Sequence, residues 1–178
     1  MKRKWLASAA AFGIVALMGV PVLAQEMKMS AVPQSPEWQK LATLVGHWEG
    51  VYEAPDGTKM NGTLEVRMTG DNSAIMHLMN RDAPHEMVTM IHPDGKRLLA
   101  THYCAAHNHP RMALVPSKNA GEVAFDFVDG TNIAPGEHYM RKVIFRFVDA
   151  DHHEEEWTAM GSDGKLNSAV FKYTRVKK

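Results

Sequence analysis

Apolar and polar residues alternate along the chain from Gly46 onward, in short segments separated by turn residues. Sequences such as PDG at 55–57 and 93–95 and SDG at 162–164 favour turns, and such signals recur about every eight to twelve residues. The segments between them predict ten strands, over residues 47–54, 61–69, 73–80, 85–92, 96–104, 110–115, 122–128, 138–148, 153–160 and 166–176. Regular short strands of this kind indicate an all-β sandwich or barrel in one domain.

A short helix is predicted directly before the first strand. Ser35 and Pro36 have the order of an N-cap followed by a proline at the first helical position. The apolar residues that follow are spaced as one helical face, and Gly46 stops the helix. These apolar residues are Trp38, Leu41, Leu44 and Val45.

Alternation also assigns side chains to the two faces of each strand. In the strand predicted over 138–148, one face is apolar except for Arg141. Its apolar members are Tyr139, Val143, Phe145 and Phe147. In the 153–160 strand, Trp157 and Ala159 share a face, and the acidic run 154–156 with the preceding histidines is interpreted as a solvated strand edge. His77 is interpreted as an ordinary, partly buried strand residue.

The first 24 residues have the pattern of a secretory signal peptide. Three basic residues at positions 2–4 precede an uncharged apolar run from Trp5 to Leu23, and the run closes on Val22, Leu23 and Ala24, which are small or modest in size. Cleavage there predicts a mature chain that begins at Gln25 in the periplasm or outside the cell, with a flexible leader over 25–35 and a barrel domain over 36–178. The alternative is an N-terminal transmembrane anchor, since about 19 apolar residues nearly span a bilayer.

Charge and cysteine content narrow the class of protein. All twenty acidic residues but only seventeen of the twenty basic ones follow residue 24, which leaves a mature charge of −3. No basic block is present, which argues against a nucleic-acid partner or a stable membrane anchor after cleavage. Cys104 is the only cysteine, so the domain has no internal disulfide and depends on its core.

The segment before and within the first strand carries the pattern LxGxWxG, with Gly46 and Trp48 at its centre. This opening resembles that of the calycin superfamily, which includes the lipocalins and fatty-acid-binding proteins, and it is similar to bacterial lipocalin-like domains. A more distant likeness is to nitrobindin-type haem barrels. The resemblance implies a closed up-and-down β-barrel of eight to ten strands. It also implies that Trp48 closes one end and that Arg175, on the last strand, packs across it.

The same resemblance implies that the barrel binds a small, mostly apolar ligand. Candidate ligand-binding residues are Arg141, Arg111, Tyr103, His102 and Trp157. Arginine receives carboxylates in two-pronged hydrogen bonds, and an inward arginine needs an anionic ligand or a barrel acid beside it. Leu98, Ala100, His102 and Cys104 share a strand face that changes from apolar to polar, which predicts that His102 lies near the mouth of a cavity.

Two further functions remain open from the sequence. A haem group or a divalent metal ion is one, because imidazole and thiolate are common metal ligands and four such side chains lie within eight positions. They are His102, Cys104, His107 and His109. The other is a barrel enzyme, although no nucleophile elbow, phosphate loop or nucleotide fingerprint names a catalytic set.

Overall fold

The computed structural model describes residues 35–53 and 57–177. The predicted signal peptide and nearly all of the predicted leader lie outside these residues. The strands are β1 (Gly46–Glu53), β2 (Lys59–Thr69), β3 (Ala74–Met79), β4 (Met87–Asp94), β5 (Arg97–Tyr103), β6 (His109–Val115), β7 (Glu122–Thr131), β8 (Tyr139–Phe147), β9 (His152–Met160) and β10 (Leu166–Arg175). Each overlaps one of the ten strands that the sequence predicted.

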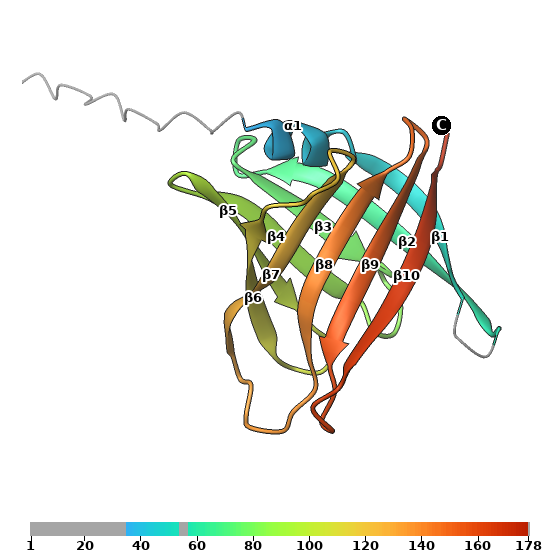
Figure 1. Cartoon of the computed structure of the whole chain (residues 1–178). Coiled ribbons are helices and arrows are strands. Elements are labelled where there is room, and N and C mark those ends of the chain that lie inside the picture. The colour runs from blue at the N-terminus through green and yellow to red at the C-terminus, as the bar shows by residue number, and fades with distance from the viewer. Residues whose placement is uncertain (1–34, 54–56, 178) are drawn as a thin grey trace, which may run out of the picture. The chain divides into compact units, whose positions relative to one another are not determined.

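The strands form a closed antiparallel barrel. Each strand pairs with the one before it, and β1 also pairs with β10, which closes the sheet (Figure 1). Closure removes the exposed sheet edges that would otherwise invite pairing with other chains. The predicted up-and-down β-barrel is confirmed. None of the helices in the described part of the chain is long and apolar enough to cross a membrane.

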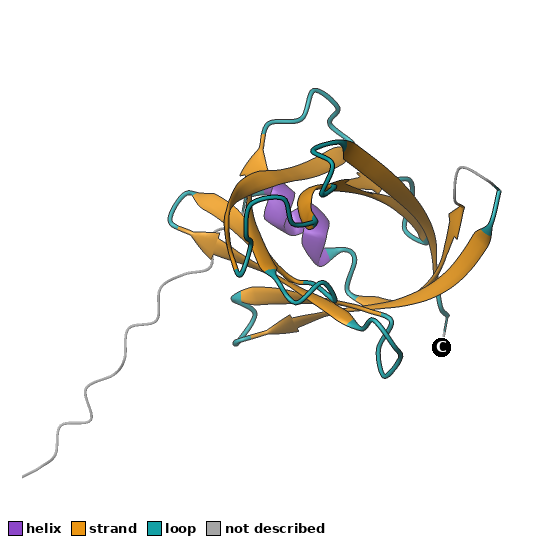
Figure 2. Cartoon of the chain, turned by 90° about the horizontal axis from the view of Figure 1, so that it is seen from below, coloured by secondary structure: helices purple, strands orange, loops and turns teal. Residues whose placement is uncertain are grey.

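The single helix of the described residues, α1 (Pro36–Ala42), covers one end of the barrel. Its N-cap is Ser35, whose hydroxyl oxygen accepts a hydrogen bond of 3.1 Å from the backbone N–H of Trp38. Trp38 and Leu41 are buried and belong to the barrel core, so the apolar face of the helix packs onto the strands. Figure 2 looks from the opposite end and shows α1 behind the ring of strands.

Successive strands run in opposite directions, so alternate loops gather at the same end of the barrel. We call the end covered by α1 the helix end. The loops that follow β3, β5, β7 and β9 lie at the opposite end, which we call the far end (Figure 1). Inward side chains from all ten strands fill the space between these two ends.

One predicted strand face differs in the structure. The pairing of β8 with β9 shifts at Arg141, between Met140 and Lys142. Met140 packs against the core and Val143 is fully buried, so the inward positions change from even to odd numbers across this bulge. Tyr139 therefore does not share the inner face of Val143. A bulge adds one unpaired residue, and simple alternation in the sequence does not reveal it.

Candidate functional site

The helix end is closed by Trp48 and Arg175. These residues are directly paired across β1 and β10, and the guanidinium carbon of Arg175 lies 4.0 Å from the centroid of the Trp48 ring. The indole is 2 % exposed, and its N–H donates a hydrogen bond of 2.8 Å to the carbonyl oxygen of Leu44. The contact expected from the resemblance is therefore present, and a cation–π attraction adds to the packing.

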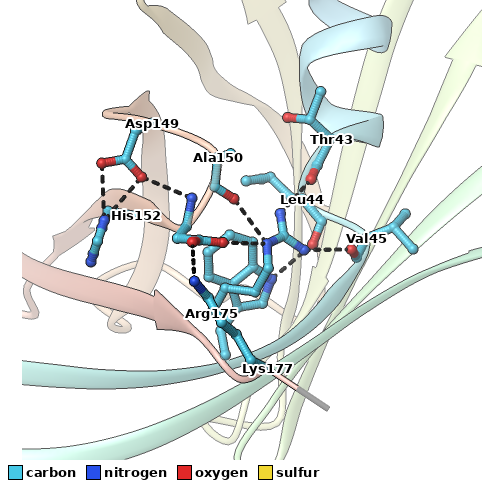
Figure 3. A network of polar contacts seen from close by, with 10 residues as sticks. Thr43, Leu44, Val45, Asp149, Ala150, His152, Arg175 and Lys177 are labelled. Atoms are coloured by element: carbon cyan, nitrogen blue, oxygen red, sulfur yellow. Dashed lines mark hydrogen bonds and ion pairs between the residues drawn. The ribbon is translucent and has the colours of Figure 1, made fainter.

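Arg175 also ties together the segments that meet at the helix end (Figure 3). Its Nη2 and Nη1 donate to the carbonyl oxygens of Thr43 and Val45, each at 2.8 Å, and its Nε donates to that of Ala150 at 2.9 Å. One planar side chain thus satisfies carbonyl groups after α1 and in the loop between β8 and β9. Arginine suits this role because its donors form a rigid, planar fork.

A polar cluster lies inside the barrel, below this closed end. The carboxylate of Glu155 is 0 % exposed. Its Oε1 lies 2.8 Å from Nε2 of His77 and 3.1 Å from Nε2 of His153, and its Oε2 accepts from Nε1 of Trp157 at 2.9 Å. Three donors from β3 and β9 therefore converge on one buried acid, which is the arrangement that a buried charge requires.

The charge state of this cluster follows from its surroundings. Burial by itself raises the pKa of Glu155, but the adjacent His77 and His153 outweigh that effect and hold the pKa well below its usual range. Burial, and then the negative charge of Glu155, raise the pKa of the Tyr173 hydroxyl. Glu155 is therefore ionised and Tyr173 is neutral. Because an isolated buried carboxylate is costly, the two imidazoles are its compensating partners.

His102 lies on β5, closer to the far end. Its Nδ1 lies 2.9 Å from the hydroxyl oxygen of Thr89 on β4, and its ring centroid is 4.9 Å from that of Trp157. Burial, with a smaller contribution from His77, lowers the pKa of His102 to about 3, so the imidazole is neutral. Its Nε2 is buried and has no hydrogen-bond partner. Nδ1 of His77, Nδ1 of His153 and Oδ1 of Asn108 are buried without a partner as well, but these two histidines each contact Glu155 through Nε2. Such groups are uncommon in protein interiors and call for an explanation.

Apolar side chains line the inner face of the barrel beyond His102. Met79 is buried, whereas Met87, Met140 and Phe171 are only partly buried as they pack against the core. The ring of Tyr52 lies 5.3 Å from that of Phe171. We call these five residues the far-end rim. Methionine side chains are flexible and adapt to irregular shapes, so this rim can repack.

The predicted ligand-binding residues separate into two groups. His102 and Trp157 lie inside the barrel and are buried. Tyr103 is 46 % exposed, and Arg111 is exposed in an ion pair with Asp129. The remaining arginine of the predicted set, Arg141 in the bulge of β8, is about a third exposed, with its Nη2 at 3.5 Å from Asp126.

The four predicted metal ligands do not converge as a set, because His107 and His109 lie away from the interior position of His102. His102 points into the barrel, His107 is exposed in the loop after β5, and the ring of His109 lies 5.1 Å from the exposed Tyr103. Cys104 is partly buried and makes no disulfide. Within the described residues, no group of three or more histidine, cysteine, aspartate or glutamate side chains could hold a metal ion.

The packed interior does not fit a haem group, the cofactor that the distant likeness to haem barrels implied. Ala100 and Met112, which lie near His102 on the inner face, are 0 % exposed, and Trp157 is buried as well. A porphyrin ring does not fit among side chains that are packed this closely.

Sequence reasoning missed His77, His153 and Glu155. The interpretation of 153–156 as a solvated strand edge was wrong for two of these residues, because His153 and Glu155 point into the barrel. Alternation contained the signal, since Glu155 and His153 precede the inward Trp157 by two and four positions. The adjacent acidic residues at 154–156 nevertheless favoured the interpretation as a solvent-exposed strand edge over the one that alternation indicates.

Comparisons with known proteins support the fold alone. No family model matches the chain, and no curated protein matches it. Among solved structures, it is similar to a protein of unknown function from the DUF3598 family of Nostoc punctiforme, with 12 % identity, a TM-score of 0.53 and coverage of 76 % of this chain and 48 % of that one. The chain thus spans about half the length of the Nostoc protein. It is also similar to Rv2717c from M. tuberculosis, with 12 % identity, a TM-score of 0.55 and coverage of 81 % and 99 %.

Proposed function

We propose that this chain is an exported β-barrel protein that binds a small amphipathic ligand at the far end of the barrel, with the polar group of the ligand at Nε2 of His102. Export rests on the basic, apolar and small-residue pattern of the first 24 residues. The ligand-binding part rests on the interior of the barrel, and the periplasm or the medium is the proposed location.

One observation carries the binding proposal. Nε2 of His102 is buried without a hydrogen-bond partner, and leaving such a group unsatisfied costs about 1–3 kcal/mol. A hydroxyl or carboxyl group of a ligand would remove this cost. The imidazole is neutral near pH 7, because its pKa is lowered to about 3. It therefore offers a hydrogen bond rather than a positive charge, which favours an amphipathic ligand over a strongly anionic one.

The far-end rim supplies the apolar part of this site. Met87, Met140 and Phe171 are partly exposed, whereas the inward residues around His102 are fully buried. A ligand would displace flexible methionine side chains and extend its apolar part along the space that they leave. The proposed ligand is therefore small and flexible.

The test is titration with dodecanol and dodecanoate, followed through tryptophan fluorescence, to which Trp157 contributes with its ring 4.9 Å from that of His102. We expect saturable binding, weakened about tenfold by His102→Phe, which removes the hydrogen bond. His109→Phe is the matched control, since His109 is on the neighbouring strand but contacts the exposed Tyr103. Absence of binding, or equal effects of both substitutions, would contradict the proposal.

A metal ion is a second candidate ligand of His102. Metal-bound histidines commonly use their other ring nitrogen to hydrogen-bond an oxygen atom, and Nδ1 of His102 lies 2.9 Å from the Thr89 hydroxyl. The tautomer in which Nδ1 donates to Thr89 leaves a lone pair on Nε2. Thermal unfolding with and without added metal ions would test this candidate, since a ligand that binds only the folded state raises the melting temperature.

A further inference from the structure

We propose that the far end of the barrel binds one copper(I) ion, with Nε2 of His102 and the sulfur atoms of Met79, Met87 and Cys104 as its ligands. This inference rests on the second candidate function and specifies its metal. It keeps His102 and Cys104 from the set that the sequence suggested and replaces His107 and His109 with the methionine sulfur atoms of β3 and β4; Cys104 directly follows β5.

The strand register brings two of the sulfur atoms together. Met79 on β3 and Met87 on β4 are direct cross-strand partners. Both belong to the inner face, since Met79 is buried in the core and Met87 packs against it. Cβ atoms of directly opposed residues lie about 4.5–5.5 Å apart, so two methionine side chains at these positions can meet at one ion.

The register also places His102 and Cys104 beside Met87. His102 is paired with Thr89, two positions from Met87 on the same face, which makes Met87 and His102 diagonal neighbours about 7–8 Å apart. Tyr103 is paired with Val88, so Cys104 follows at the level of Met87. Cys104 is partly buried and its thiol is free.

His102 provides the independent indication of a ligand. Its side chain is 1 % exposed, its Nε2 has no partner, and its Nδ1 is held by Thr89 on the barrel wall. Because Nε2 is the ring nitrogen farther from the backbone, it faces away from that wall and into the interior. A neutral imidazole fixed in this way is ready to donate a lone pair without deprotonation.

The donor set selects the metal. Thioether and thiolate sulfur favour copper(I), whereas magnesium, calcium and manganese favour carboxylate oxygen. Glu155 is the buried acid of the barrel interior. Its oxygens already lie within hydrogen-bonding distance of His77, His153 and Trp157, so they are not part of the proposed donor set. On binding, the Cys104 thiol would release its proton to solvent. One thiolate and one monovalent cation then give a neutral site, which suits a buried, apolar position.

The test is anaerobic titration of the purified protein with copper(I) in competition with bathocuproine disulfonate. We expect one equivalent to bind, and we expect Met87→Leu to weaken binding by at least about tenfold, as loss of even an outer-shell partner can do. Met68→Leu is the matched control, because Met68 also packs against the core but lies at the helix-end part of β2. Cys104→Ser should weaken binding as well, and X-ray absorption should show sulfur next to copper.

Three results would overturn the inference: no bound copper, copper surrounded only by nitrogen and oxygen, or equal effects of the Met87 and Met68 substitutions. The dodecanol titration separates this inference from the first candidate function. Binding of dodecanol without copper would refute only the copper site, whereas binding of copper without dodecanol would refute only the amphipathic ligand.

Discussion

At the helix end, the contact between Trp48 and Arg175 both fills the end of the barrel and provides hydrogen bonds to backbone carbonyl groups. Trp48 fills the end of the barrel, and Arg175 covers its ring while satisfying three carbonyl groups of the surrounding loops. The edge-on ring of His153 packs beneath Trp48, with centroids 4.3 Å apart. The closing contact and the interior polar cluster are therefore adjacent.

Removal of Trp48 should be among the most costly substitutions. We expect Trp48→Ala to lower the free energy of unfolding by about 3–5 kcal/mol, as truncation of large buried aromatic residues does. Arg175→Ala should cost less because its side chain is partly exposed. Since the two residues are in contact, a double-mutant cycle in urea should show non-additive losses. Strictly additive losses would mean that the contact does not contribute to stability.

Two of the buried titratable groups, His102 and Glu155, have strongly lowered pKa values that should make the barrel sensitive to acid. The pKa of His102 falls from 6.5 to about 3 on folding, so the unfolded chain takes up a proton that the folded chain excludes. The lowered pKa of Glu155 acts in the same direction. Stability should therefore be greatest above pH 6.5 and should decrease as the pH falls toward 3. Urea unfolding across this range would measure the decrease, and His102→Phe should make it less steep.

Among the elements, β1 depends on a glycine for its position against β10. Gly50 is paired with Tyr173, and a Cβ atom at Gly50 would lie 2.3 Å from a ring carbon of that buried tyrosine. Its cross-strand partner on β2, Gly62, has more room, because the nearest atom to a Cβ there is the side-chain oxygen of Asn80 at 3.1 Å. A side chain at Gly50 would therefore collide with a buried aromatic ring, whereas a side chain at Gly62 would meet only the end of an amide side chain.

This difference predicts different costs for the same substitution. Gly50→Ala should lower stability by about 1–3 kcal/mol, because the Tyr173 ring must move within a packed core. Gly62→Ala should have a smaller effect, since the half-buried amide of Asn80 needs to shift by only a few tenths of an ångström, at the expense of its 3.3 Å hydrogen bond from the Thr63 backbone N–H. Thermal unfolding of the two variants provides the comparison. Equal melting temperatures would show that Tyr173 has space to relax.

At the scale of the whole molecule, closure by β1 and β10 leaves no strand edge for other chains, which suits a protein that has no disulfide. If the chain is exported as proposed, it folds outside the cytoplasm and must be stable there without a disulfide. Its stability would come from the core that extends from α1 to the far-end rim.

The export proposal predicts a defined N-terminus. Mass spectrometry of the protein recovered from the periplasm or the medium of a bacterial host should show a chain that begins near Gln25, because signal peptidases cleave after small residues such as Ala24. A substitution that introduces an acidic residue into the apolar run, such as Ala16→Glu, should retain the uncleaved precursor in the cell. Full-length wild-type chain held in membranes would contradict export and support the alternative of an anchor.

The sequence by itself determined the ten strands and the short helix that precedes them. These features depend on local properties, namely alternation, turn residues and caps, whereas the closing pair Trp48–Arg175 was implied by the resemblance to a known superfamily of barrels. The bulge in β8 did not change the number of strands. Ser35 caps the start of α1, as its side chain predicts. Local signals of this kind do not require knowledge of which residues meet across the barrel.

Only the tertiary structure decided which polar residues share the interior. His77, His153 and Glu155 come from strands far apart in the sequence, and they meet because barrel closure brings β3 and β9 to face each other across the core. The bulge at Arg141 likewise changed a face that strict alternation had assigned. Register, bulges and closure are set by the packing of the whole barrel, so the polar cluster and the free nitrogen of His102 could not be located from the order of residues alone.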